Sequence, residues 1–257
     1  MQIINKVVPK TEDDSPIQIM LFYDTHLGST KCDIAELRSR IAYVRDTPNC
    51  YAILGGDLIN NSTKTSVGDV YSEPLTPQQQ VELAVRTFDP IKDKILGICA
   101  GNHERRTRKL DGIDVVQLIA WQLDVEDVYD YTSILLFLRT TNKESHAPMY
   151  TIYFTHGDGN GGRTIGGKAN GLLRRGQIVD ADIIIAGHTH QPFCTREVSY
   201  QINRTHQCVV EHEQVYVNAG ATLDYEEYAE LYGMKPSSKA NPKIILGTKD
   251  YNIQVMM

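Results

Sequence analysis

Acidic, amide and imidazole side chains recur in this sequence directly after short apolar runs. Five such groups follow one another along the chain: Asp24-Thr25-His26, Gly55-Gly56-Asp57, Gly101-Asn102-His103-Glu104, His156-Gly157-Asp158 and Gly187-His188-Thr189-His190. Carboxylate, imidazole and amide oxygen ligands suit Mn²⁺, Fe or Zn²⁺, and no thiolate biases the set toward softer metals. A carboxylate shared by two cations would hold them about 3.5 to 4 Å apart, as in two-metal hydrolases. The pattern therefore predicts a metal centre with room for two cations.

The apolar runs that precede these groups, and others like them, are predicted strands. They cover residues 17–23, 50–54, 94–100, 133–139, 149–155, 182–186, 214–218, 242–246 and 251–256. Predicted helices cover residues 33–45, 77–93, 111–123 and 168–179. This succession of strands and helices is typical of an α/β fold. Because ligands of such sheets bind outside the carboxyl ends of the strands, the polar groups are expected to converge on one cleft.

Two local signals refine this expectation. Asp33 is a candidate N-cap for the helix at 33–45, because Glu36 follows three residues later. The polar segment between the strands at 133–139 and 149–155 is typical of a hairpin connection. A mixed or antiparallel sheet is therefore expected in the second half of the chain.

Composition sets further bounds. The 257 residues are 41% hydrophobic and 23% charged, as in an ordinary globular protein. The net charge of -6 argues against a surface built as a whole to coat nucleic acid, although a local basic groove is compatible with it. The five cysteines form no CxxC pair and are expected to be reduced. Without an internal repeat or a long linker, the chain is expected to form one domain over residues 1–257.

The sequence also bears on location. No apolar run approaches the roughly 18 to 20 residues that cross a bilayer. The first residues lack the apolar stretch and the small-residue cleavage site of a secretory signal. We therefore expect a cytoplasmic protein without a membrane partner.

The order D-x-H, G-D, G-N-H-E, H-G and G-H-x-H, which spans residues 24 to 190, resembles the calcineurin-like metallophosphoesterase superfamily. The resemblance implies an α/β fold of four layers, an αββα sandwich of two mixed β-sheets flanked by helices. It implies that Asp24, His26 and His190 hold one cation, that Asn102, His156 and His188 hold the other, and that Asp57 bridges them. A hydroxide between the cations would attack the phosphorus. Asn218 lies in a turn similar to a later turn of the family, but no ligand is assigned to it.

The resemblance gives His103 a different role from the ligands. It matches a histidine that lies outside the metal shell, contacts the phosphate and helps the leaving oxygen depart. That role needs a protonated imidazole near the cations. We expect Mn²⁺ as the metal, with Fe, Zn²⁺ and Ni²⁺ as alternatives.

Basic residues near the proposed ligands indicate the substrate. Arg105, Arg106, Arg108 and Lys109 follow His103, and the glycine-rich segment with its flank adds Arg163, Lys168, Arg174 and Arg175. A positive mouth of this kind would attract a polyanion. Arg105, Arg106 and Arg163 are therefore the candidate substrate-binding residues. We expect a phosphodiesterase or nuclease acting on a nucleotide or nucleic acid. The alternatives are a phosphomonoesterase acting on a small molecule or phosphoprotein, and a non-catalytic binding module.

Overall fold

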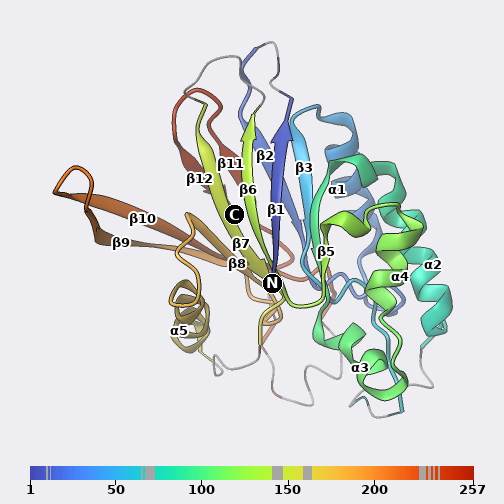
Figure 1. The fold of residues 1–257 in the computed structure, drawn as a ribbon. Coiled ribbons are helices and arrows are strands. Elements are labelled where there is room, and N and C mark those ends of the chain that lie inside the picture. The colour runs from blue at the N-terminus through green and yellow to red at the C-terminus, as the bar shows by residue number, and fades with distance from the viewer. Residues whose placement is uncertain are drawn as a thin grey trace.

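Two six-stranded mixed sheets pack face to face and carry helices on their outer faces, so the expected α/β sandwich is confirmed (Figure 1). The structure, a computed structural model, describes residues 1–9, 11, 13–64, 66, 73–140, 147–158, 164–225, 230, 233, 235–236 and 238–257. Apolar side chains from both sheets and from helices form a main core, and a second, smaller apolar cluster lies on the outer face of the first sheet.

The first sheet combines parallel and antiparallel pairs. Its strands in spatial order are β1 (Gln2–Val8), β6 (Ser133–Thr140), β7 (Met149–Thr155), β8 (Ile183–Ala186), β10 (Cys208–Asn218) and β9 (Phe193–Asn203). The expected hairpin is present, since β6 and β7 are antiparallel neighbours. β8 is buried on both faces: Ile183 and Ile185 belong to the core between the sheets, and Ile184 packs toward α5 (Ile165–Gly176).

The second sheet carries the strands that precede the first three polar groups. Its spatial order is β12 (Ile253–Met256), β11 (Lys243–Leu246), β2 (Ile17–Phe22), β3 (Cys50–Leu54), β4 (Ile95–Cys99) and β5 (Tyr129–Asp130). β2, β3 and β4 run parallel, so their carboxyl ends meet at one edge. The two sheets approach closely at Gly97 of β4, where a β-carbon would collide with the ring of Phe154 on β7.

Helices flank both sheets. On the side of the second sheet lie α1 (Ile34–Asp46), α2 (Pro77–Phe88), which continues as the 3₁₀ helix η2 (Asp89–Lys94), α3 (Asn102–Asp111), α4 (Val115–Gln122) and the short η3 (Glu126–Val128) (Figure 1). α5 lies on the first sheet. The cap predicted for α1 is confirmed, because the Asp33 side chain accepts a hydrogen bond from the Glu36 N–H.

The predicted helix at 111–123 is wrong in its boundaries. α3 ends before Gly112, whose φ of 73° is left-handed, and Asp114 then caps α4. Glycine favours this backbone conformation, so the chain breaks there into two helices. The helix predicted at 168–179 starts earlier, at Ile165, because the Thr164 hydroxyl caps it. The helix predicted at 77–93 is helical only to Phe88 and is 3₁₀ beyond it.

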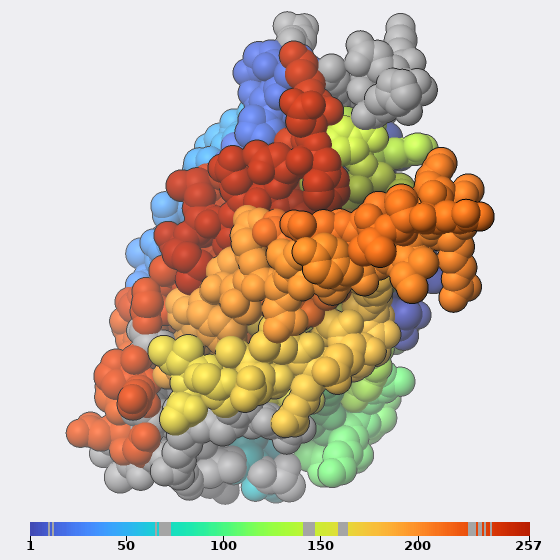
Figure 2. Space-filling view, turned by 90° about the vertical axis from the view of Figure 1, so that its left-hand side faces the viewer, coloured from blue at the N-terminus to red at the C-terminus, as the bar shows by residue number. Residues whose placement is uncertain are grey.

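Three strands are absent from the sequence prediction: β1, β5 and β9. β10 is also longer than the strand predicted at 214–218, since it begins at Cys208. With β9 it forms a two-stranded arm that stands out from the body of the molecule (Figures 1 and 2). All five cysteines are free, as expected. Among the described residues, the helices are too short or too polar to cross a bilayer.

Candidate metal centre

All seven side chains expected to bind metal gather where the two sheets meet at the carboxyl ends of their strands. β2 leads into Asp24 and His26, β3 into Asp57, β4 into Asn102, β7 into His156, and β8 into His188 and His190. The expected convergence therefore occurs, and it draws on both sheets of the sandwich.

Asp24, His26 and His190 form one cluster, in which the possible ligand atoms lie within 4.8 Å of one another. The Oδ1 atom of Asp24 is 3.2 Å from His190 Nε2 and 3.9 Å from His26 Nε2. This is the set that the family resemblance assigned to one cation.

Asp57, His156 and His188 form a second cluster of the same size. His156 Nε2 lies 3.3 Å from Asp57 Oδ2 and 3.2 Å from His188 Nδ1. The Oδ1 atom of Asn102 reaches into the same space, 2.9 Å from His156 Nε2 and 2.6 Å from His188 Nδ1. This cluster contains the set assigned to the other cation.

Asp57 connects the clusters. Its Oδ2 atom is 3.3 Å from His156 Nε2 on one side and 3.9 Å from His26 Nε2 on the other. His103 stands beside this carboxylate, with its Nε2 atom 3.8 Å from Asp57 Oδ2. His26, Asp57 and His103 thus form a third group of possible ligands, in which His103 is an addition to the predicted set.

The donor atoms fit a divalent cation. Asp24 Oδ1 and His26 Nε2 are both buried and form no well-aligned hydrogen bond among the described residues, although His190 Nε2 lies 3.2 Å from Asp24 Oδ1. Leaving buried polar atoms unpaired costs about 1 to 3 kcal/mol each. A cation between them would satisfy both atoms, and an oxygen with an imidazole nitrogen suits Mn²⁺ or Zn²⁺.

Hydrogen bonds to residues outside the proposed ligand set orient the imidazole rings. His156 Nδ1 donates to the Gly55 carbonyl oxygen at 3.0 Å, so its Nε2 atom is left to face Asp57. His26 Nδ1 pairs in the same way with Asn60 Oδ1 at 3.1 Å. Such contacts fix the tautomer of a metal-binding histidine and orient its ring.

The backbone at the site is unusual. Five of the candidate ligands have left-handed φ angles between 44° and 66°: Asp24, His26, Asp57, His188 and His190. Each such residue costs of order 1 kcal/mol, and strain of this kind concentrates at functional sites. The turns direct successive side chains, such as His188 and His190, into one small space.

Glu104 holds these turns together, a role that sequence reasoning missed. Its buried carboxylate accepts hydrogen bonds from the backbone N–H groups of Asp57, Ile59 and Gly101 at 2.8 to 3.1 Å. It therefore ties the turn after β3 to the turn after β4. Burial, together with the charge of Asp57, raises the pKa of Glu104 to about 7.

Burial and neighbouring charges together set the pKa values of the carboxylates and imidazoles in the site. Burial opposes ionisation of Asp57, yet His156, His103 and His26 together hold the pKa of that carboxyl well below its usual range. Burial likewise works against protonation of His156, but Asp57 outweighs it and raises the pKa of His156 to about 9. Burial and the neighbouring His103 lower the pKa of His26 to about 3. The Asp24 and Asp57 carboxylates, whose pKa values are lowered, are thus ionised at neutral pH and available to cations.

Two arginines of the predicted positive mouth contact Tyr131 within the protein. The Arg105 guanidinium donates to the Tyr131 carbonyl oxygen at 3.1 Å, and Arg108 lies 3.7 Å above the Tyr131 ring. Both side chains are held by contacts with Tyr131, because the turn of α3 that carries them packs there. Arg106 donates to the Ser66 hydroxyl at 3.0 Å, and burial together with the charge of Arg106 lowers the pKa of His103. Arg106 thus remains the candidate nearest His103, and Arg163 lies outside the described residues.

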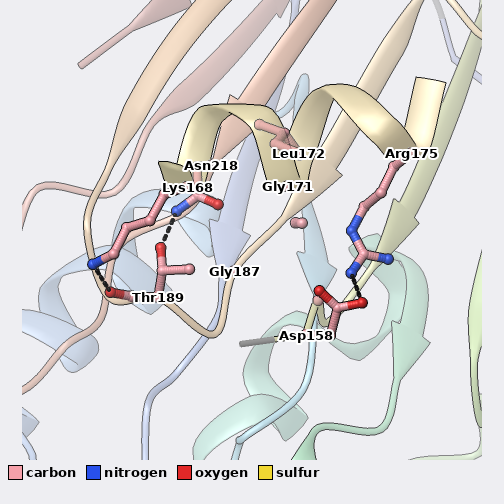
Figure 3. A pocket seen from close by; sticks show the side chains of 10 residues that line it. Asp158, Lys168, Gly171, Leu172, Arg175, Gly187, Thr189 and Asn218 are labelled. Atoms are coloured by element: carbon pink, nitrogen blue, oxygen red, sulfur yellow. Dashed lines mark hydrogen bonds and ion pairs between the residues drawn. The ribbon is translucent and has the colours of Figure 1, made fainter. Parts of the chain in front are cut away.

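Asn218, which was not predicted to bind metal, supports the loop after β8. Its buried amide donates to the Thr189 hydroxyl (Figure 3) and to the Gln191 carbonyl oxygen, each at 2.8 Å. It thereby braces the loop that carries His188 and His190.

The contacts of Glu104 predict the effect of replacing it by glutamine. In Glu104→Gln the amide nitrogen cannot accept, so at least one buried N–H group loses its acceptor. We expect the free energy of unfolding of the metal-free protein to fall by about 1 to 3 kcal/mol in urea titrations. Glu82→Gln, at an exposed position of α2, should stay within about 0.5 kcal/mol of wild type. Equal stabilities for Glu104→Gln and wild type would contradict this role.

The raised pKa of His156 predicts that cations compete with a proton. In the metal-free protein His156 carries that proton at neutral pH, so binding must release it. Cation affinity should therefore rise between about pH 7 and 9, by up to about tenfold per pH unit for one proton. Calorimetry in buffers of different ionisation enthalpy counts the released protons. Affinity that stays constant over this range would be contrary to the prediction.

Residues 17–192 match the family described as calcineurin-like phosphoesterase, and no curated protein matches the sequence. Solved structures with a similar fold include Vacuolar Protein Sorting 29 from Cryptosporidium parvum, at 12% identity, covering 95% of this chain and 98% of that one with a TM-score of 0.45. A predicted phosphoesterase from Streptococcus pneumoniae TIGR4 is 12% identical over 94% and 90% of the two chains, with a TM-score of 0.38.

Wild-type Vps29 from Entamoeba histolytica, crystallised with zinc, is 11% identical over 93% of this chain and 97% of that one, with a TM-score of 0.37. Likenesses this distant do not bear on activity. The family match, in contrast, covers more than half of the chain and includes every one of the five strand-end groups. The chain therefore belongs to the calcineurin-like phosphoesterase family.

Proposed function

We propose that this protein is a metal-dependent hydrolase of phosphodiesters in a nucleotide or nucleic acid, and that it uses two divalent cations. The observation that carries the proposal is the position of Asp57 between two clusters of potential ligands. Asp24, His26 and His190 would hold one cation, and Asn102, His156 and His188 the other. Mn²⁺ is the proposed metal, with Fe, Zn²⁺ and Ni²⁺ as alternatives.

Bound cations of this kind polarise phosphoryl oxygens, neutralise charge that develops in the transition state and lower the pKa of a bound water. The chain contributes the geometry. Glu104 and the left-handed turns keep the donor atoms in place before substrate arrives. Prior organisation of this sort avoids rearrangement during the reaction.

His103 is proposed to protonate the leaving oxygen. Its Nδ1 atom donates to the Asn60 carbonyl oxygen at 2.6 Å, which leaves Nε2 directed at the space beside Asp57. An imidazole fixed in this way can deliver a proton from Nε2 to an alkoxide that departs from phosphorus. Burial lowers the pKa of His103, the charge of Arg106 adds to this effect, and the charge of Asp57 opposes it. Protonation of His103 therefore depends on the negative charge beside it. Arg106 is proposed to contact the substrate phosphate.

Two alternatives deserve comparison. Hydrolysis of monoesters is favoured by one observation: Arg105 and Arg108 contact Tyr131, so fewer free cations surround the site than a long polyanion would use. A non-catalytic binding module would have no need for a complete ligand set with His103 beside it. Turnover of a nitrophenyl phosphodiester against the matching monoester, with each metal in turn, distinguishes these three functions.

The Asp57 carboxylate lies between the two clusters, so its replacement tests the bridging role. Asp57→Asn should reduce metal content and turnover more than substitution of any other single ligand, because only Asp57 approaches both clusters. Elemental analysis and phosphodiester turnover measure the two effects. Asp127→Asn, at an exposed carboxylate near β1, is the matched control. A purified Asp57→Asn protein with two metals per chain and normal turnover would rule out bridging.

Replacement of His103 separates proton donation from metal binding. His103→Gln should keep both cations and slow hydrolysis of an alkyl diester by roughly 10² to 10⁴. A nitrophenyl ester should lose less, since its leaving group departs without a proton. His206→Gln, near the exposed tip of the arm, should change neither rate. Equal losses on both esters would show that His103 does not act as the acid, and loss of metal would make it a ligand.

A further inference from the structure

The two faces of the β9–β10 arm lie in different surroundings. In an antiparallel pair, residues directly opposite one another point to the same side of the sheet. Val215 of β10 lies opposite Arg196 of β9 and belongs to the core between the sheets. Since side chains alternate along a strand, Val198, Tyr200 and Ile202 lie on the same side as Arg196. The side of the sheet that forms the core in the body therefore continues along the arm.

The side chains of Val198, Tyr200 and Ile202, the apolar row, are exposed. Their solvent-accessible fractions are 54%, 75% and 77%, and Val209, directly opposite Ile202, is 62% accessible. The arm stands clear of the body in both views of the molecule (Figures 1 and 2). Contiguous apolar side chains on the surface of a folded protein are typical of an interaction site.

Contacts on the other side hold the arm in place. Gln201 donates to Asp180 Oδ2 at 2.6 Å, and the Nδ1 atom of His212 lies 3.6 Å from Asp180 Oδ1. Asp180 belongs to the connection between α5 and β8, so these contacts tie the arm to the body. The apolar row is thus held in one direction, which lowers the entropic cost of binding.

β9 is also an open edge of the first sheet, where among the described residues it pairs with β10 alone. The other edge strands are less suited to pairing. β12 and β5 have four and two residues, and β1 carries Lys6, whose ammonium lies 3.7 Å from Asp127. Short strands and charges of this kind protect sheet edges from other chains. β9 has eleven residues, and residues 198–202 include neither a charge nor a proline.

We propose that β9 pairs with β9 of a second copy of this chain, antiparallel and centred on Tyr200. The strand is self-complementary in this register. Val198 would lie opposite Ile202 of the partner subunit, and Tyr200 opposite Tyr200 of the partner subunit, so the two apolar rows would meet on one face. On the other face, Ser199 would lie opposite Gln201 of the partner subunit. The two arms would form one four-stranded ribbon.

Other registers match less well. If the strands were centred on Ser199, the charged Arg196 would lie opposite the apolar Ile202 of the partner subunit. A slip by one residue would place the two apolar rows on opposite faces. In the register centred on Tyr200, Arg196 lies beyond the apolar pairs and keeps its own ion pair with Glu213.

The length of the arm leaves room for both bodies. β9 begins at Phe193, seven residues before Tyr200. In an antiparallel pair centred on Tyr200, the bases of the two arms would lie roughly 45 Å apart at opposite ends of the ribbon. Pairing would also give the arm two more strands, and a lone two-stranded hairpin is only marginally stable in water. The proposal does not depend on metal binding or on the proposed function.

Sedimentation equilibrium of the full chain, with and without Mn²⁺, tests the pairing. Wild type should dimerise reversibly. Tyr200→Lys should raise the dissociation constant at least about tenfold, because two ammonium groups would lie opposite each other. Val210→Lys is the matched control: Val210 is an exposed side chain of β10 on the other face of the arm, so this variant should dimerise like wild type. Equal effects of the two substitutions would overturn the proposal.

A pair of opposite charges tests the register. Tyr200→Glu alone should weaken the dimer as Tyr200→Lys does, since two carboxylates would then meet. A mixture of the two variants should form heterodimers, because opposite charges lie across the edge. A mixture that associates no better than either variant would overturn the pairing centred on Tyr200. A wild type that stays monomeric at every concentration would overturn the second copy as occupant and assign the β9 edge to a strand of another protein.

Discussion

Burial of the Asp57 carboxylate is the constraint on which the rest of the site depends. This side chain is shielded from bulk solvent and surrounded by imidazoles, so bulk water does little to stabilise its charge. A buried carboxylate is stable only beside positive charge or strong hydrogen-bond donors. In the metal-free protein a proton on His156 supplies that charge. Divalent cations would supply more positive charge than this proton does. They would also be ligated by the buried Asp24 Oδ1 and His26 Nε2 atoms.

The arrangement of the strands and turns places the groups that surround Asp57. Parallel strands bring their carboxyl ends to one edge, and the closeness of the two sheets lets β7 and β8 add imidazoles opposite the carboxylates of β2 and β3. Glu104 then ties neighbouring turns together through backbone donors. Because the turns are left-handed and strained, their geometry depends on these outer contacts as much as on the ligands themselves.

Much of this arrangement could be predicted from the sequence, because each central apolar run stops abruptly at Asp, Asn, His or Gly. What could not be predicted has physical causes. α3 lacks apolar periodicity, since its polar side chains contact loops instead of a sheet. The β9–β10 arm alternates polar and apolar residues in solvent, so no continuous apolar run marks it. Glu104 accepts from backbone N–H groups, and Asn60 orients His26 through its side-chain oxygen and His103 through its carbonyl oxygen. Residue spacing does not reveal such contacts, and the direction of Arg105 depends on the position of Tyr131.

The central claim is that two cations share Asp57, and electron paramagnetic resonance of the Mn²⁺-loaded protein tests it most directly. Two Mn²⁺ ions bridged by one carboxylate lie about 3.5 to 4 Å apart and are magnetically coupled. A titration should therefore saturate at two ions per chain and give the spectrum of a coupled pair. Saturation at one ion, or two ions with the spectrum of isolated Mn²⁺, would contradict the account.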